Sequence, residues 1–352
     1  MFLETALGFC RGIFIGAERL YNDGEAGGWA PAGEAVGLEG SAAARRFLHP
    51  EILKRALRLD LAVRLAVESY LAGAHRSVRR GFSVEFSDYR EYAPGDDVAD
   101  LDWRVYARTD KYYLKCFEAE TSTRCLLAVD CSRSMAWRSR PELPTKAEYA
   151  GFVAAALGYL LHRQRDRVGL ALFDRRLRAL IPPKSRRAHL YSILEALGRG
   201  LDSPAAGEAA SALQELAAHV RRRGMTVIIS DLLTARAEEV IAAVEHLAWR
   251  GQDVLVLQVL DPEELAPRLE SDELLREPET GREYQADGFG AARCREALRA
   301  LIAGYRARFQ ALGVDYAALS TESPFDRALG AFLASRNVRR RGAHRRLARG
   351  SA

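Results

Sequence analysis

The stretch that decides the fold is Cys125-Leu126-Leu127-Ala128-Val129-Asp130-Cys131-Ser132-Arg133-Ser134. Its first five residues form a continuous apolar run, which is typical of a strand that is buried on both faces of a sheet. The residues that follow place a carboxylate and two hydroxyls directly behind the strand, in the pattern D-x-S-x-S. The sequence therefore predicts a buried strand that carries oxygen ligands to one edge of a sheet.

Downstream of this stretch, apolar strands alternate with segments of helical periodicity. We expect further strands at 167–173, 177–181, 225–229, 253–260 and 314–319, and helices at 146–163, 187–197, 208–222, 235–249, 293–312 and 325–335. The short link 174–176 predicts a hairpin between the first two of these strands. This order predicts an α/β fold with a doubly wound, mostly parallel sheet and one antiparallel edge strand.

The composition divides the chain into four parts. Residues 1–45 are rich in Gly and Ala, which predicts a disordered leader. Residues 46–122 are expected to form a helix and an irregular N-terminal subdomain, and residues 123–336 the α/β domain. Residues 337–352 form a basic tail, which we interpret as a solvated terminus. No aromatic residues interleave the tail, so we expect no nucleic-acid binding.

The N-terminal subdomain has no simple periodicity. Apolar residues indicate a helix over 52–71 and short strands around 84–86 and 113–117. A turn at Pro94–Asp97 is expected to start a short helix that ends near Trp103.

Cysteine usage and hydropathy indicate the compartment. The chain has five cysteines and no C-x-x-C pair, which suits a reducing environment. No apolar run approaches the roughly 18 residues of a membrane span, and the N-terminus does not resemble a signal peptide. We therefore expect a cytoplasmic protein without a membrane span.

Oxygen ligands follow two of the expected strands. Asp130, Ser132 and Ser134 follow the first, and Asp231 follows the strand at 225–229. Carboxyl ends of parallel strands meet at one edge of the sheet, so these side chains are expected to lie close together. A hard cation such as Mg²⁺ takes about six oxygen ligands and keeps several waters. The sequence therefore predicts a site for Mg²⁺ or Mn²⁺.

This pattern resembles the metal-ion-dependent adhesion site of von Willebrand factor A domains. The resemblance implies a von Willebrand A-like domain that binds a partner's acidic side chain through the metal. Such sites usually take a threonine from a later loop, but residues 202–211 contain none. Ser203, Ser211 or water are the candidates for that position. The alternative interpretation is an aspartate that caps the next helix, with its serines in a turn.

An upstream signature also resembles a known family. The stretches Arg80–Phe86, Arg90–Asp97, Leu101–Trp103 and Ala107–Thr109 resemble the bacterial family catalogued as domain of unknown function 58. That resemblance implies an A-domain-like fold and a partner among MoxR-type AAA+ ATPases. The signature either forms a structural ion-pair network or recognises the partner, and its residues of interest are Arg90, Tyr92, Gly95, Asp96, Asp97, Asp102, Trp103 and Arg108.

Three functions remain open from the sequence. The first is a non-catalytic, metal-dependent protein-binding module, an adaptor or cofactor of an AAA+ ATPase. The second is a metal-dependent hydrolase, with Asp130 or Cys131 at its centre. The sequence offers no Gly-rich phosphate loop and no G-x-S-x-G elbow, so we name no catalytic residue. The third is a scaffold with an empty metal site.

Overall fold

A computed structural model describes residues 84–91, 103–119, 123–202, 204–220, 223–268, 274–276, 283–285 and 290–331. The described residues fall into two compact units, one within Tyr70–Ser122 and one within Thr123–Ala352. The expected leader, the helix at 52–71 and the basic tail lie outside the described residues.

The larger unit is built on a six-stranded sheet with the order β10-β7-β6-β3-β4-β5. All neighbours are parallel except β4 and β5, which form the predicted antiparallel hairpin. The predicted doubly wound, mostly parallel α/β sheet is therefore confirmed. The strands are β3 (Arg124–Asp130), β4 (Arg167–Phe173), β5 (Leu177–Lys184), β6 (Gly224–Ser230), β7 (Gln252–Leu260) and β10 (Asp315–Ser320).

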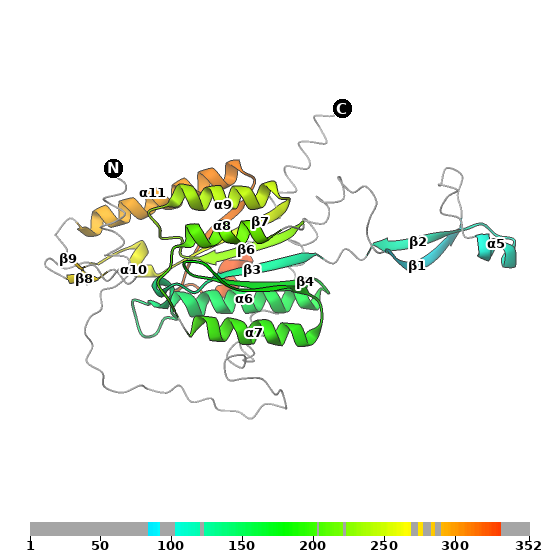
Figure 1. Cartoon of the computed structure of the whole chain (residues 1–352), viewed down its shortest axis with the longest axis horizontal. Helices are drawn as coiled ribbons and strands as arrows, with labels where there is room; N and C mark the ends of the chain where they lie inside the picture. Colours follow the sequence, from blue (N-terminus) through cyan, green and yellow to red (C-terminus); the bar gives the residue numbers. More distant parts are fainter. Residues whose placement is uncertain are drawn as a thin grey trace, which may run out of the picture. The chain divides into compact units, whose positions relative to one another are not determined.

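Helices cover both faces of this sheet (Figure 1). One face carries α6 (Lys146–Arg163) and α7 (Arg187–Leu201). The other carries α8 (Ala209–His219), α9 (Ala237–Trp249) and α11 (Gly290–Ala311). The inner strands β3, β4, β6 and β7 are buried almost throughout, which explains why they read as continuous apolar runs.

The winding of the sheet reverses between β3 and β6. From β3 the chain moves through β4 to β5 on one side, and from β6 through β7 to β10 on the other. In open α/β sheets, ligands bind outside the carboxyl ends of the strands at this point of reversal. Asp130 ends β3 and Asp231 follows β6, so both acids lie at the reversal.

The long elements match their predicted ranges closely, whereas four short ones among the described residues were not predicted. These are a 3-10 helix (Arg133–Ala136), α10 (Pro262–Leu265), β8 (Leu274–Arg276) and β9 (Glu283–Gln285). Segments of three or four residues are too short to show a period, so hydropathy does not reveal them. The last helix is described over 325–331, where Phe325 lies 6.3 Å from Phe152 of α6, measured between ring centroids.

The smaller unit contains a hairpin and a helix. Strand β1 (Val84–Glu91) pairs antiparallel with β2 (Tyr113–Ala119), where short strands were predicted. The helix α5 spans Trp103–Thr109. The short helix predicted from Asp97 to near Trp103 lies almost wholly outside the described residues, so it stays a prediction.

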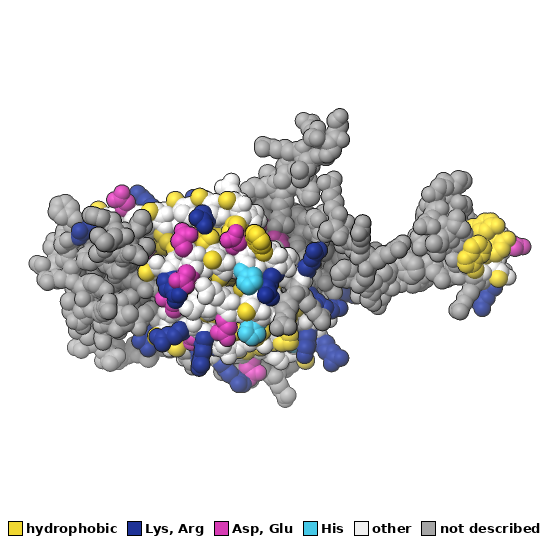
Figure 2. Space-filling view, turned by 45° about the horizontal axis from the view of Figure 1, so that its top comes forward, with side chains coloured by type: hydrophobic (Ala, Val, Ile, Leu, Met, Phe, Trp, Pro, Cys, Tyr) yellow, Lys and Arg dark blue, Asp and Glu magenta, His cyan; other side chains and the backbone are white. Residues whose placement is uncertain are grey.

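Charges of both signs are interspersed on the face of the larger unit that α8, α9 and α11 cover (Figure 2). The net positive charge is therefore not gathered into one patch on this face. Among the described residues, no helix combines the length and the hydropathy that crossing a membrane requires.

A buried carboxyl joins the starts of β3 and β4, and it predicts a pH dependence of stability. Asp166 Oδ1 accepts a hydrogen bond of 2.7 Å from the Thr123 amide. Burial raises the pKa of Asp166 from 3.8 to about 7, and the hydrogen bond from the Thr123 amide opposes this shift. The folded chain therefore holds the proton more tightly than the unfolded chain. The group stabilises the fold below about pH 4, and that contribution is lost as the pH rises towards about 7.

We predict that Asp166→Asn makes the free energy of unfolding less dependent on pH between about pH 4 and pH 7. One such carboxyl contributes a slope of at most about 1.4 kcal/mol per pH unit. Urea denaturation at several pH values measures the slope, with Glu142→Gln at an exposed carboxyl as the control. Equal slopes for the wild type and Asp166→Asn would contradict the prediction.

Candidate functional site

Asp130 is fixed between two neighbouring strands at the point of reversal. Its Oδ1 atom accepts a hydrogen bond of 2.8 Å from the Ser132 amide, and its Oδ2 atom accepts one of 2.5 Å from Ser230 Oγ. Ser230 is the last residue of β6, which pairs with β3. The carboxylate is only 2% exposed. Asp130 therefore has a single orientation, set by the pairing of β3 with β6.

Two serine hydroxyls lie beside it. Ser132 Oγ and Ser134 Oγ are 2.9 Å apart, and both side chains are buried. Ser132 is the N-cap of a short 3-10 helix, Arg133–Ala136. The bond from the Ser132 amide to Asp130 is the turn that the alternative interpretation expected. The turn does not exclude a ligand role, because it gathers the two hydroxyls on the side of the carboxylate.

The loop before α8 closes over these serines with its backbone. The Arg133 amide donates to the Ala205 carbonyl at 2.9 Å, and Ser132 forms an isolated bridge with Ala205. A Cβ atom added at Gly207 would lie 2.4 Å from Ser132 Cβ. Glycine is therefore required at position 207 if Ser132 is to keep its place.

Of the two serines that were considered for the position of the missing threonine, the structure describes only Ser211. Ser211 lies on α8, and its hydroxyl accepts a hydrogen bond of 3.0 Å from Arg236 Nη1. Ser203 lies outside the described residues. Ser203 and water therefore remain the candidates for that position.

Asp231 follows β6 and is held from three sides. Its Oδ1 atom accepts from the Leu233 amide at 3.2 Å, and its carbonyl accepts from Gln258 Nε2 at 2.7 Å. Its Oδ2 atom accepts a hydrogen bond of 2.9 Å from Lys146 Nζ. The predicted second carboxylate is therefore at the predicted edge, but a lysine contacts it.

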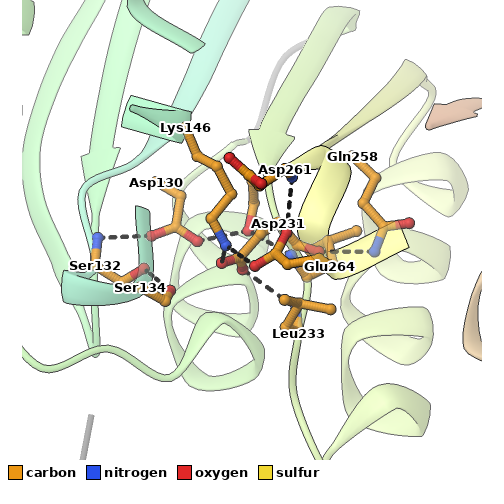
Figure 3. A network of polar contacts seen from close by, with 11 residues as sticks. Asp130, Ser132, Ser134, Lys146, Asp231, Leu233, Gln258, Asp261 and Glu264 are labelled. Carbon is orange, nitrogen blue, oxygen red and sulfur yellow. Dashed lines mark hydrogen bonds and ion pairs between the residues drawn. The ribbon is translucent and has the colours of Figure 1, made fainter. Parts of the chain in front are cut away.

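Lys146 places a positive charge inside the site (Figure 3). Its Nζ atom bonds Asp231 Oδ2 and also Glu264 Oε1, the latter at 2.6 Å, and Lys146 is fully buried. Burial alone would lower the pKa of Lys146. The charges of Asp231 and Glu264 outweigh that effect and raise the pKa, so the side chain is an ammonium ion.

The surroundings of Asp130 disfavour its charged form, whereas those of Lys146 favour the charged form. Burial raises the pKa of its carboxyl, and the neighbouring charge of Asp231 raises it further. Hydrogen bonds from Ser230 and Ser132 oppose these shifts. A buried carboxylate beside a second one is unfavourable unless a positive charge compensates it, and a cation bound next to Asp130 would do so.

The donor set fits a small hard dication that is bound mainly through hydroxyls. Within the described part of the chain, His, Cys, Asp and Glu side chains form no group of three or more that could hold a metal ion. An ion would instead be ligated by Ser132 and Ser134, with Asp130 and Asp231 acting through bound water, as the sequence predicted. Mg²⁺ suits this arrangement because it prefers oxygen ligands and retains several waters.

The upstream signature mostly lies outside the described residues. This applies to Tyr92, Gly95, Asp96, Asp97 and Asp102, and to the side chain of Arg90. Trp103 is 57% exposed and meets Tyr106 edge-on, with 6.2 Å between the ring centroids. Arg108 is exposed in the last turn of α5. The roles predicted for the signature stay predictions.

Sequence reasoning missed Lys146 and Glu264. Lys146 lies three residues before Tyr149 and seven before Val153, so it falls on the apolar stripe of α6. A lysine at a buried helical position needs a partner, and that was the available signal. Glu264 closes the capping box Asp261-Pro262-Glu263-Glu264, a pattern that can also be read from the sequence.

Comparisons with known proteins give the family. A model described as "Protein of unknown function DUF58" matches residues 88–308. Uncharacterized proteins of Mycobacterium tuberculosis and Mycobacterium bovis are 32% identical over 244 residues, which cover 67% of this chain and 74% of each relative.

Two solved structures are also similar to this chain. The conserved hypothetical protein BatB from Bacteroides thetaiotaomicron has 17% identity and a TM-score of 0.37, over 60% of this chain and 97% of its own. An aerotolerance-related membrane protein from Bacteroides fragilis has 16% identity and a TM-score of 0.38, over 60% and 98%. On the family model and the mycobacterial relatives, the chain belongs to the DUF58 family of proteins of unknown function.

Proposed function

We propose that this chain is a non-catalytic protein-binding module that holds Mg²⁺ or Mn²⁺ and binds an acidic side chain of a partner. The observation that carries the proposal is the pair of hydroxyls 2.9 Å apart beside Asp130, with Asp231 on the neighbouring strand end. This set, like the D-x-S-x-S pattern, resembles the metal-ion-dependent adhesion site of von Willebrand A domains.

The cation would supply a positive centre for a partner's carboxylate. Ser132 and Ser134 would ligate it, and Asp130 and Asp231 would orient its waters. The backbone at Ala205 and Gly207 keeps Ser132 in place. A charge-assisted contact in such a desolvated site is stronger than one on the open surface.

A hydrolase that uses Cys131 receives no support from the geometry. The Cys131 side chain is 1% exposed. Burial, and next the negative charge of Asp130, raise the pKa of its thiol to about 12. The thiolate is the nucleophilic form of cysteine, so Cys131 is unreactive at neutral pH.

We predict that the double variant Asp130→Ala, Ser132→Ala binds Mn²⁺ at least about tenfold more weakly than the wild type. The reason is the loss of one ligand and of the carboxylate that orients bound water. Isothermal calorimetry measures the affinity, and Ser211→Ala, which removes a hydroxyl bonded to Arg236, is the matched control. Equal affinity of the double variant and the wild type would refute the site. If the wild type binds no Mn²⁺, even with its partner present, the chain is a scaffold.

A second prediction concerns Gly207, which lies against Ser132. Gly207→Ala adds a methyl group only 2.4 Å from Ser132 Cβ, so Ser132 and the loop that carries residue 207 must move apart and the placement of the Ser132 hydroxyl must change. The affinity for Mn²⁺ should fall while the chain stays folded, as calorimetry and thermal unfolding will show. Gly304→Ala on α11 is the control, because nothing lies within 4 Å of its added Cβ. Unchanged affinity in Gly207→Ala would mean that Ser132 is not a ligand.

We propose a MoxR-type AAA+ ATPase as the partner, which is what the family resemblance implies. The ATPase should copurify with the wild-type chain in Mg²⁺, and much less in a chelator or with the double variant. If neither the chelator nor the double variant weakens the association, the ATPase does not bind through the cation site.

A further inference from the structure

A buried ammonium shared by two carboxylates lies beside the proposed cation site. Lys146 Nζ is 2.9 Å from Asp231 Oδ2 and 2.6 Å from Glu264 Oε1. Lys146 and the Glu264 side chain are 0% exposed, and the Asp231 side chain is 5% exposed. The proposed function uses Asp231 but assigns no role to Lys146 or Glu264.

Both side chains are held by ordered helix starts. Lys146 is the first residue of α6, which Thr145 and Glu148 cap reciprocally. Glu264 Oε2 accepts a hydrogen bond of 2.8 Å from the Asp261 amide in a second capping box. The ammonium cannot turn to solvent without leaving two buried carboxylates unpaired, which is strongly unfavourable. It is therefore a fixed charge.

A fixed positive charge next to a cation ligand has a predictable effect. Lys146 bonds the carboxylate that would orient the dication's water, and like charges repel each other more strongly where water is excluded. Lys146 therefore weakens cation binding. Glu264 contacts the same ammonium and returns a negative charge, so it strengthens cation binding.

Building on the proposed cation site, we propose that Lys146 and Glu264 set its affinity for the dication in opposite directions and so keep it open to an acidic partner. When all three carboxyls are ionised, as a bound dication favours, Asp130, Asp231, Glu264 and Lys146 together carry two formal negative charges, which the dication neutralises. Without Lys146 the loaded site would keep a negative charge and repel a carboxylate. Lys146 thus lowers the affinity for the cation alone and permits the acidic side chain to bind.

The test compares Mn²⁺ affinity in Lys146→Met and Glu264→Gln, which nearly preserve side-chain volume. We expect Lys146→Met to bind Mn²⁺ about tenfold more tightly than the wild type, and Glu264→Gln about tenfold more weakly. The variant that carries both substitutions, Lys146→Met and Glu264→Gln, restores the wild-type charge, and its Mn²⁺ affinity should return close to that of the wild type. A purely structural role for the pair predicts instead that both single variants bind more weakly, or that neither changes.

Thermal unfolding of each variant shows whether it is folded. If Lys146→Met does not fold, the comparison of Glu264→Gln with the variant Lys146→Met, Glu264→Gln still decides. Equal Mn²⁺ affinity of these two variants would overturn the inference. If the wild type binds Mn²⁺ and the affinities of both single variants shift in the same direction, the inference is overturned and the proposed function stays intact. Absence of Mn²⁺ binding to the wild type, with or without the partner, would overturn both.

Discussion

The ammonium of Lys146 is the contact on which the carboxyl edge of the sheet depends. It joins the start of α6, the loop after β6 and the short helix α10 through Asp231 and Glu264. Its removal would leave two buried carboxylates without a counter-charge, whereas most surface ion pairs contribute little to stability. The orientation of Asp231, and with it the geometry of any ion bound between β3 and β6, follows from this contact.

The topology explains why these groups meet at all. The reversal of the winding between β3 and β6 leaves the ends of two adjacent strands uncovered by a crossover. Asp130 and Ser230 lie at those ends and share a hydrogen bond across the two strands. Because Ala205 and Gly207 have small side chains or none, the backbone of their loop approaches Ser132 closely. The result is a site rich in oxygen ligands in which each carboxylate is fixed before any ion binds.

Much of this arrangement could be predicted from the sequence because it depends on short-range periodicity and on the rules of parallel sheets. Asp130 and Asp231 were expected at one edge because both follow apolar strands, and the structure places them there. The contact between Gly207 and Ser132 depends on how an irregular loop folds back, and local periodicity carries no information on that. The two carboxylate partners of Lys146 lie 85 and 118 residues away along the chain. Only the buried position of Lys146 in the helical pattern indicated that it needs partners.

The most direct measurement of the proposed cation site is a crystal structure of the chain grown with Mn²⁺, with an anomalous difference map. We predict one peak within bonding distance of Ser132 Oγ and Ser134 Oγ, separated from Asp130 and Asp231 by one water each. The Lys146 ammonium should still contact Asp231 and Glu264. A map without a peak at this edge, or with the ion displaced to another group of ligands, would contradict the proposed site.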